Sequence, residues 1–182
     1  MSIEQKSLKQ IIDHRIDKLR ELRKKGINPY PSEFKPTHFS ESIKSNYKKM
    51  EGINVVVAGR IMSLRKMGKA SFFRIFDKEG GIQIFIKKDD VGYESYENFK
   101  LLDIGDFVGI QGIVFTTKTG EISIKTSIIT VLAKSIRPLP IVKEKDGTIY
   151  DAFSDKEQRY RNRHLDLLLN PNVKNTFLKR TK

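Results

Sequence analysis

The 182-residue sequence contains no cysteine, no tryptophan and only three histidines. Without cysteine there are no disulfides and no thiolate metal ligands. His14, His38 and His164 are too scattered to suggest a metal site or a hydrolytic triad. The Walker phosphate loop, the Gly-x-Ser-x-Gly elbow and the zinc-hydrolase helix are also missing. We therefore expect no structural metal, no bound cofactor and no catalytic residues in this sequence.

The sequence also lacks long apolar runs. No stretch is long enough to span a bilayer, and Ser2 to Gln10 is polar, without the apolar centre of a secretion signal. We therefore expect a cytoplasmic protein that does not associate with membranes.

Acidic residues are in the minority, because 22 Asp and Glu stand against 35 Lys and Arg and the net charge is +13. Such a charge predicts a polyanionic partner, and the absence of a basic anchor with an apolar face favours nucleic acid over lipid. A basic fragment whose acidic half is missing remains an alternative.

Residues Val55 to Ile86 carry the strongest structural pattern. The stretch is rich in β-branched and aromatic residues, and Gly68 and the Gly80–Gly81 pair divide it into three antiparallel strands. Alternation assigns apolar residues to one face and a mixed set to the other. The apolar face holds Phe73, Ile75, Ile82, Ile84 and Ile86, and the mixed face holds Phe72, Arg74, Gln83 and Phe85.

Aromatic rings beside an arginine and an amide suit stacking on nucleic-acid bases and reading their edges. In the alternative interpretation, Phe72 and Phe85 lie beneath a loop or a helix.

Further elements flank these strands. The spacing predicts an amphipathic helix from about Ile3 to Lys25, whose polar face could be an accessory RNA contact, and a helix from Ser40 to Met50 with Ser40 as its N-cap. The polar face of the first helix carries Lys6, Lys9, Arg15, Lys18, Arg20 and Arg23. A third helix is expected over residues 89–102, followed by strands over 105–116 and 121–132 that are joined by a tight turn.

Three strands, a helix and two strands is the order of a five-stranded Greek-key OB-fold barrel. The fold class is thus mainly β with flanking helices. Such barrels bind on the face of strands 2 and 3 and through the loops of residues 66–69 and 118–121. A barrel without a ligand, or one that binds protein, is the alternative.

Composition divides the chain into four segments. We expect a helical extension over residues 1–50, the barrel over 51–134, a proline- and charge-bearing linker over 135–158, and over 159–182 the truncated start of another domain.

Several short motifs together resemble the N-terminal part of class II lysyl-tRNA synthetases. They are Gly26 to Pro31, Ala58 to Arg60, Met67 to Phe72, Thr117 to Glu121, Arg137 to Pro140 and Arg159 to Leu167. They cover nearly the whole chain. One departure is His164, where the family usually has tyrosine.

The resemblance implies a barrel that binds the anticodon of the lysine tRNA, whose middle base is uridine. It implies that Phe72 stacks on a base, that Gln83 reads a base edge and that Glu121 accepts a hydrogen bond from a base. Arg60 and Arg65 would hold a base or phosphate. The expected RNA-binding set also includes Arg74, Phe85, Lys69 and Lys118. Arg74 and Lys69 are expected to contact phosphates.

The parent enzyme would attach lysine to its tRNA with ATP and magnesium, as a homodimer formed through a catalytic domain that this sequence does not contain. Two alternatives stay open: the equivalent region of an aspartyl or asparaginyl enzyme, and a stand-alone protein that binds single-stranded nucleic acid. Glu121 could also be an ordinary residue of a surface turn.

Overall fold

The computed structural model describes residues 7–140, 143–145, 148–150, 153 and 155–181. The chain forms two compact units, Met1–Pro138 and Leu139–Lys182, and each is described by itself. The division into four segments that composition predicts, residues 1–50, 51–134, 135–158 and 159–182, stays a prediction.

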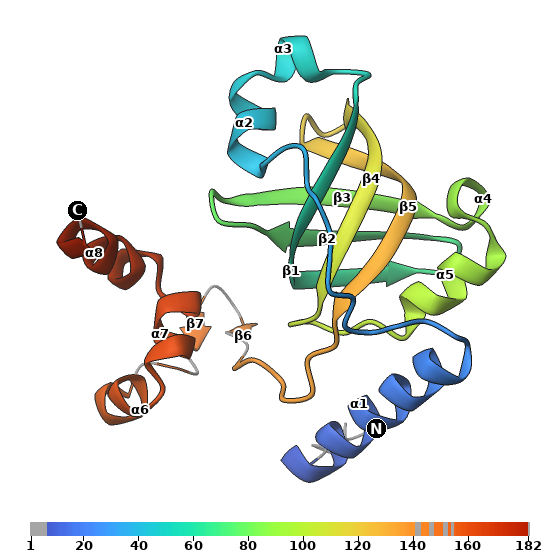
Figure 1. Ribbon diagram of the computed structural model, residues 1–182. Coiled ribbons are helices and arrows are strands. Elements are labelled where there is room, and N and C mark those ends of the chain that lie inside the picture. The colour runs from blue at the N-terminus through green and yellow to red at the C-terminus, as the bar shows by residue number, and fades with distance from the viewer. Residues whose placement is uncertain (1–6, 141–142, 146–147, 151–152, 154, 182) are drawn as a thin grey trace. The chain divides into compact units, whose positions relative to one another are not determined.

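The first unit is built on a closed barrel of five strands (Figure 1). The strands are β1 (Asn54–Met67), β2 (Ala70–Phe76), β3 (Gly81–Lys87), β4 (Phe107–Thr116) and β5 (Ile122–Ala133). Their order around the barrel is β1-β2-β3-β5-β4, and β4 closes on β1. The β3–β5 pair is parallel and the other pairs are antiparallel. The predicted five-stranded barrel is confirmed.

The predicted alternation in β2 and β3 is confirmed as well. Phe73, Ile75, Ile82, Ile84 and Ile86 are at most 2% exposed and fill the interior. Because successive side chains of a strand point to opposite faces, the residues between them must lie on the outside.

Residues 7–138 of this unit form five helices. They are α1 (Leu8–Lys24), α2 (Ser40–Ser45), α3 (Tyr47–Met50), α4 (Lys88–Val91) and α5 (Tyr93–Lys100). Two predicted helices are each divided in two: the helix from Ser40 breaks at Asn46, and that of residues 89–102 breaks at Gly92, where φ is +84°. A left-handed residue cannot continue a right-handed helix.

The prediction that Ser40 caps α2 is wrong. Ser40 is the first helical residue and is buried, and its backbone N–H and hydroxyl donate to the Asp77 carboxylate at 2.6 and 2.8 Å. Asp77 also accepts from the N–H groups of Glu79 and Gly80 in the turn between β2 and β3. A carboxylate from a distant turn therefore satisfies the start of the helix.

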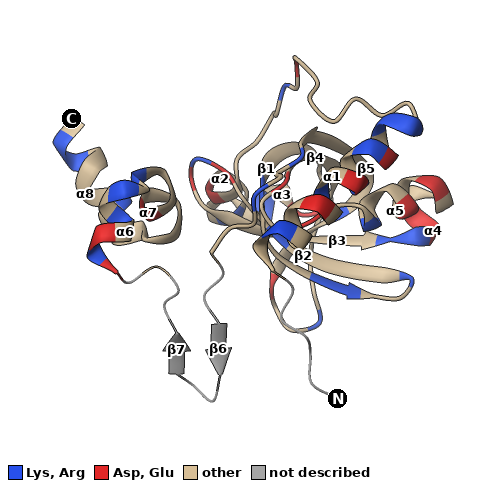
Figure 2. Ribbon diagram, turned by 90° about the horizontal axis from the view of Figure 1, so that it is seen from below, with Lys and Arg blue, Asp and Glu red and all other residues tan. Residues whose placement is uncertain are grey.

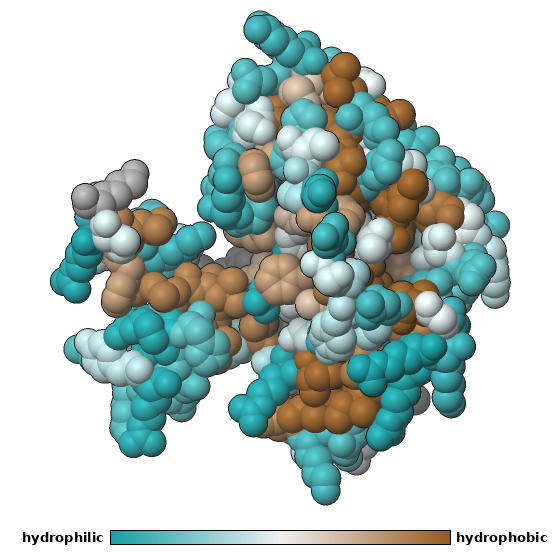
Figure 3. Space-filling view, viewed as in Figure 1, coloured by the Kyte–Doolittle hydropathy of each residue, from teal (hydrophilic) through white to brown (hydrophobic). Residues whose placement is uncertain are grey.

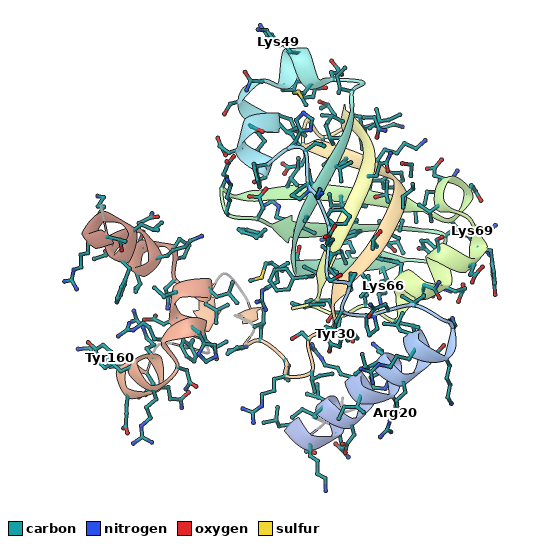
Figure 4. The ribbon with its side chains drawn as sticks, in the orientation of Figure 1. Arg20, Tyr30, Lys49, Lys66, Lys69 and Tyr160 are labelled. Carbon is teal, nitrogen blue, oxygen red and sulfur yellow. The ribbon has the colours of Figure 1, made fainter. Side chains whose placement is uncertain are left out.

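Helix α1 begins at Leu8, with Ser7 and Gln10 forming a capping box, and its predicted start at Ile3 lies outside the described residues. Arg15 is only 7% exposed, and its guanidinium donates to the carbonyls of Ser135 and Ile104 at 3.0 Å. Lys18 also turns toward the barrel. The expectation that these two cations belong to a free RNA-facing surface is therefore wrong, whereas Arg20 points away from the barrel (Figure 4).

A cluster of buried charges joins α1 to the barrel. The ammonium of Lys134, which is fully buried, lies 2.7 Å from Asp103 and 2.9 Å from Asp106, and Lys18 binds the other Asp103 oxygen at 2.6 Å. Burial raises the pKa of the Asp103 carboxyl, but the hydrogen bonds from Lys134 and Lys18 outweigh burial and hold the pKa below its ordinary value of 3.8.

The connector between α1 and α2 lies on the outside of the barrel. The ring of Phe34 covers Gly109 so closely that a Cβ atom there would lie 2.3 Å from the Phe34 Cζ atom. The Thr37 N–H donates to the Val56 carbonyl at 2.8 Å. Glycine at position 109 thus lets the connector pack against β4.

The second unit contains the hairpin of β6 (Lys143–Lys145) and β7 (Thr148–Tyr150), which lies within the predicted linker, and three helices. The helices are α6 (Lys156–Arg161), α7 (Arg163–Leu169) and α8 (Pro171–Thr181). The buried Asp166 carboxylate accepts from Arg159 at 2.8 Å, from Asn170 at 2.7 Å and from Arg163. Burial raises the pKa of Asp166, but these donors outweigh it and lower the pKa.

No helix in the described ranges is both long and apolar enough to cross a membrane. Exposed apolar side chains lie among polar ones on the visible face (Figure 3).

Asp103→Asn should destabilise the protein by roughly 2–3 kcal/mol near neutral pH, because hydrogen bonds from two ammonium groups lose their charged acceptor. The folded-state pKa of Asp103 is depressed, so its contribution is present above 3.8 and is lost as the pH falls below that value. Urea unfolding of the wild type and the variant at a series of pH values should show that the difference between their unfolding free energies decreases as the pH falls below 3.8.

Asp17→Asn is the matched control, because this exposed residue of α1 forms its one ion pair within the described part of the chain with Arg20 on its own helix. Its effect should stay below about 1 kcal/mol. If the loss of stability caused by Asp103→Asn did not depend on pH, the stabilising role of the ionised Asp103 carboxylate would be contradicted.

Candidate nucleic-acid interface

The outward faces of β2 and β3 form one continuous surface. Phe72 pairs directly with Phe85, and Arg74 pairs with Gln83. The rings of Phe72 and Phe85 are tilted, with centroids 4.8 Å apart, and Phe115 of β4 lies 6.1 Å beyond Phe85. All four paired side chains are partly exposed. Neither Phe72 nor Phe85 is fully buried by a loop or helix of the described residues.

A groove of about 900 Å³ opens over this surface. It lies between the end of β1 and the β4–β5 turn. Its lining residues are Ser63, Leu64, Arg65, Phe72, Phe73, Arg74, Gln83, Thr117, Lys118, Thr119 and Glu121. The fold therefore brings six of the nine predicted site residues into one groove: Arg65, Phe72, Arg74, Gln83, Lys118 and Glu121.

Two polar contacts cross the groove floor. The Arg74 guanidinium forms an ion pair with the Glu121 carboxylate. The Gln83 amide donates to the Ser123 hydroxyl at 3.0 Å, and that hydroxyl donates to the Glu121 carbonyl at 3.2 Å. Strands β2, β3 and β5 are thus linked by side chains as well as by their backbones.

The β4–β5 turn is fixed by Thr117. Its N–H donates to the Glu121 carbonyl at 3.0 Å, and its hydroxyl accepts from the Glu121 N–H at 3.0 Å. Gly120 has a φ of +83° and donates to the Thr117 carbonyl at 2.9 Å. The turn consequently presents Glu121 at the edge of the groove in a defined orientation.

The β1–β2 turn is fixed by helix α5. The hydroxyl of buried Tyr96 donates to the Gly68 carbonyl at 2.8 Å and lies 2.9 Å from the Ser71 hydroxyl. Gly68 has a φ of +56°. Helix α5 therefore holds the turn from which exposed Lys69 projects (Figure 4).

Charge is distributed unevenly around the barrel. Strands β1, β2 and β3 contain no Asp or Glu, whereas α4 and α5 carry four acidic residues (Figure 2). Within the groove, Glu121 is the single acidic residue of the described lining set. A polyanion approaching over β1–β3 meets a cationic surface.

Three predicted site residues lie outside the groove lining: Arg60, Phe85 and Lys69. The Arg60 guanidinium stacks 4.2 Å from the centroid of the Phe107 ring and donates to the Gly105 carbonyl at 3.4 Å. Burial lowers the pKa of Arg60. Phe85 lies beside Phe72 on the same face, so it extends the stacking surface.

Lys66, expected in the binding loop, has a structural contact instead. Its ammonium donates to the carbonyls of Lys100 and Leu102 at 2.7 and 3.2 Å, at the C-terminal end of α5. Burial, followed by the nearby charge of Lys18, lowers the Lys66 pKa. A cation at a helix C-terminus is stabilising there.

Sequence reasoning missed Ser63, Leu64, Ser123 and Phe115, whereas Thr117 and Thr119 lie within the motif from Thr117 to Glu121 but are not among the predicted site residues. Ser63 follows an irregularity in the β1–β2 register after Ile61, which strict alternation does not reveal. Thr117 had a usable signal, since a hydroxyl three residues before a turn glycine commonly bonds to the turn backbone.

No group of three or more His, Asp or Glu residues in the described part of the chain is arranged to hold a metal ion. Residues 55–132 match the tRNA anti-codon family model, described as an OB-fold nucleic acid binding domain. The barrel is an OB fold. The match supports an anticodon-binding domain of the kind found in class II aminoacyl-tRNA synthetases and is consistent with binding of tRNA.

In this OB fold, Tyr96→Phe should loosen the β1–β2 turn, because the Gly68 carbonyl and the Ser71 hydroxyl lose a buried partner. We expect a loss of about 1 kcal/mol in stability and faster amide hydrogen exchange over residues 66–70. Tyr93→Phe on the same helix, where the side chain is 65% exposed, should change neither.

Proposed function

We propose that this chain is the anticodon-binding part of a class II lysyl-tRNA synthetase and that its groove binds the central uridine of the lysine anticodon. The proposal is supported by the motifs that resemble this family and by one structural observation: Phe72, Gln83 and Glu121 line a single groove.

The three residue types match the chemistry of uracil. Phe72 offers a flat ring for stacking, beside that of Phe85. The Gln83 amide nitrogen donates to the Ser123 hydroxyl, and its carbonyl oxygen accepts no hydrogen bond from the described residues. Uracil presents one N–H donor between two carbonyl acceptors, and an amide carbonyl or a carboxylate can accept that N–H.

The surroundings suit the RNA backbone. Arg65 and Lys118 line the groove, and Lys69 projects from the adjacent turn. In the complete enzyme, a catalytic domain would supply lysine activation with ATP and magnesium and the homodimer interface. The described residues offer no metal-binding cluster, and no catalytic step is assigned to them.

Phe72→Ala should weaken binding to the lysine anticodon stem-loop by roughly 1–3 kcal/mol, the usual contribution of one base–aromatic stack. Fluorescence anisotropy with labelled stem-loops measures the loss, and the melting temperature checks the fold. Phe76→Ala is the matched control, because this phenylalanine of the same strand is 42% exposed and does not line the groove. Equal affinity of the wild type for stem-loops with and without the central uridine would reject the proposal and favour general single-strand binding.

Lys69→Ala should weaken all RNAs to a similar extent, because Lys69 is proposed to contact phosphate. The slope of log K against log salt should flatten by roughly 0.7, the value for one lost phosphate contact on a single strand. Lys49→Ala removes an equally exposed lysine from α3, away from the groove (Figure 4), and should leave the slope unchanged. A base-dependent loss with Lys69→Ala would contradict the phosphate role.

A further inference from the structure

We propose that Arg74 is a positioning residue for base recognition, holding the Glu121 carboxylate where it accepts an N–H from the bound base. The inference deepens the proposed function and rests on it. It replaces the expectation from sequence that Arg74 is a phosphate contact.

The first observation is the ion pair itself. Arg74 of β2 and Glu121 of the β4–β5 turn are bonded across the groove, and their side chains are 42% and 39% exposed. Both are accessible to a ligand, yet each already has an oppositely charged partner. A phosphate bound by Arg74 would have to compete with this carboxylate.

The main chain of Glu121 is already held in place, so only its side chain needs to be oriented. Thr117 binds both the N–H and the carbonyl of Glu121, which fixes the main chain. In the described residues, Arg74 is the one side chain bonded to the Glu121 carboxylate. Without Arg74, the carboxylate could rotate into solvent about its own side-chain bonds.

Arg74 is itself well placed to orient that carboxylate. Its backbone pairs with Ser63 of β1 on one side and Gln83 of β3 on the other, so the position from which its side chain extends is fixed. Gln83 binds Ser123, whose hydroxyl donates to the Glu121 carbonyl. The two groups proposed to read the base, Gln83 and Glu121, are therefore coupled through one network to which Arg74 contributes the charged link.

Charge gives a second reason for the pair. A lone carboxylate in an RNA-binding groove repels phosphates, whereas one paired with a guanidinium adds little net negative charge. Because only one carboxylate oxygen is bound to Arg74, the other remains available as an acceptor. The pair thus allows an acidic group to read a base in a cationic groove.

The test is a double-mutant cycle that measures base preference. The full chain, Arg74→Ala, Glu121→Ala and the double variant are titrated with lysine anticodon stem-loops whose central base is uridine or 3-methyluridine, which lacks the N–H. The preference is the ratio of the two Kd values. We expect about tenfold or more in the wild type, as for a hydrogen bond to a charged group. Each single variant should lose most of this preference, and adding Arg74→Ala to Glu121→Ala should cause no further loss.

Lys118→Ala is the matched control, since it removes one positive charge from the same groove. It should weaken both RNAs alike and keep the preference. Arg74→Gln, which keeps a polar side chain at this position, repeats the measurement if Arg74→Ala fails to fold.

Arg74→Ala or Arg74→Gln behaving like Lys118→Ala, with the preference intact, would overturn the positioning role and restore a phosphate contact. Equal losses of preference from Arg74→Ala with and without Glu121→Ala would also overturn it. Failure of the proposed function gives a different result, because the wild type would then show no preference between the two stem-loops.

Discussion

Closure of five strands around an apolar interior is the constraint on which the rest of the first unit depends. Phe73, Ile82 and Ile84 fill that interior and are almost fully buried. Since a strand turns alternate side chains to opposite faces, closure forces Phe72 and Gln83 outward. The groove is therefore a consequence of the same packing that stabilises the barrel.

The chain's net positive charge is not all available to a partner. Arg15, Lys18 and Lys134 are bound to carbonyls and carboxylates where α1 meets the barrel, and Lys66 binds the end of α5. Buried charges require such partners. Exposed cations on the outer surface of β1–β3 and in the β1–β2 and β4–β5 turns remain available to attract a polyanion.

Carboxylates organise both units from positions surrounded by cations. In the first unit, Asp106 accepts hydrogen bonds from Lys134 and from the Ser135 N–H. In the second unit, the Asp166 carboxylate accepts hydrogen bonds from Arg159, Arg163 and Asn170. The charged run from Arg159 to Leu167, which carries much of the family resemblance, thus also builds a local fold. Glu121 differs from these carboxylates because its side chain is 39% exposed and is bonded to a single cation of the described residues, Arg74.

The sequence by itself determined the strands, their turns, the order of elements and the inward and outward faces of β2 and β3. These features follow from local periodicity and from glycine at the reversals. Only the tertiary structure decided which polar groups meet. Ser40 and Asp77 are 37 residues apart, Arg74 and Glu121 are 47 apart, and Arg15 and Ser135 are 120 apart. No local pattern encodes such pairs, because barrel closure and the docking of α1 bring them together.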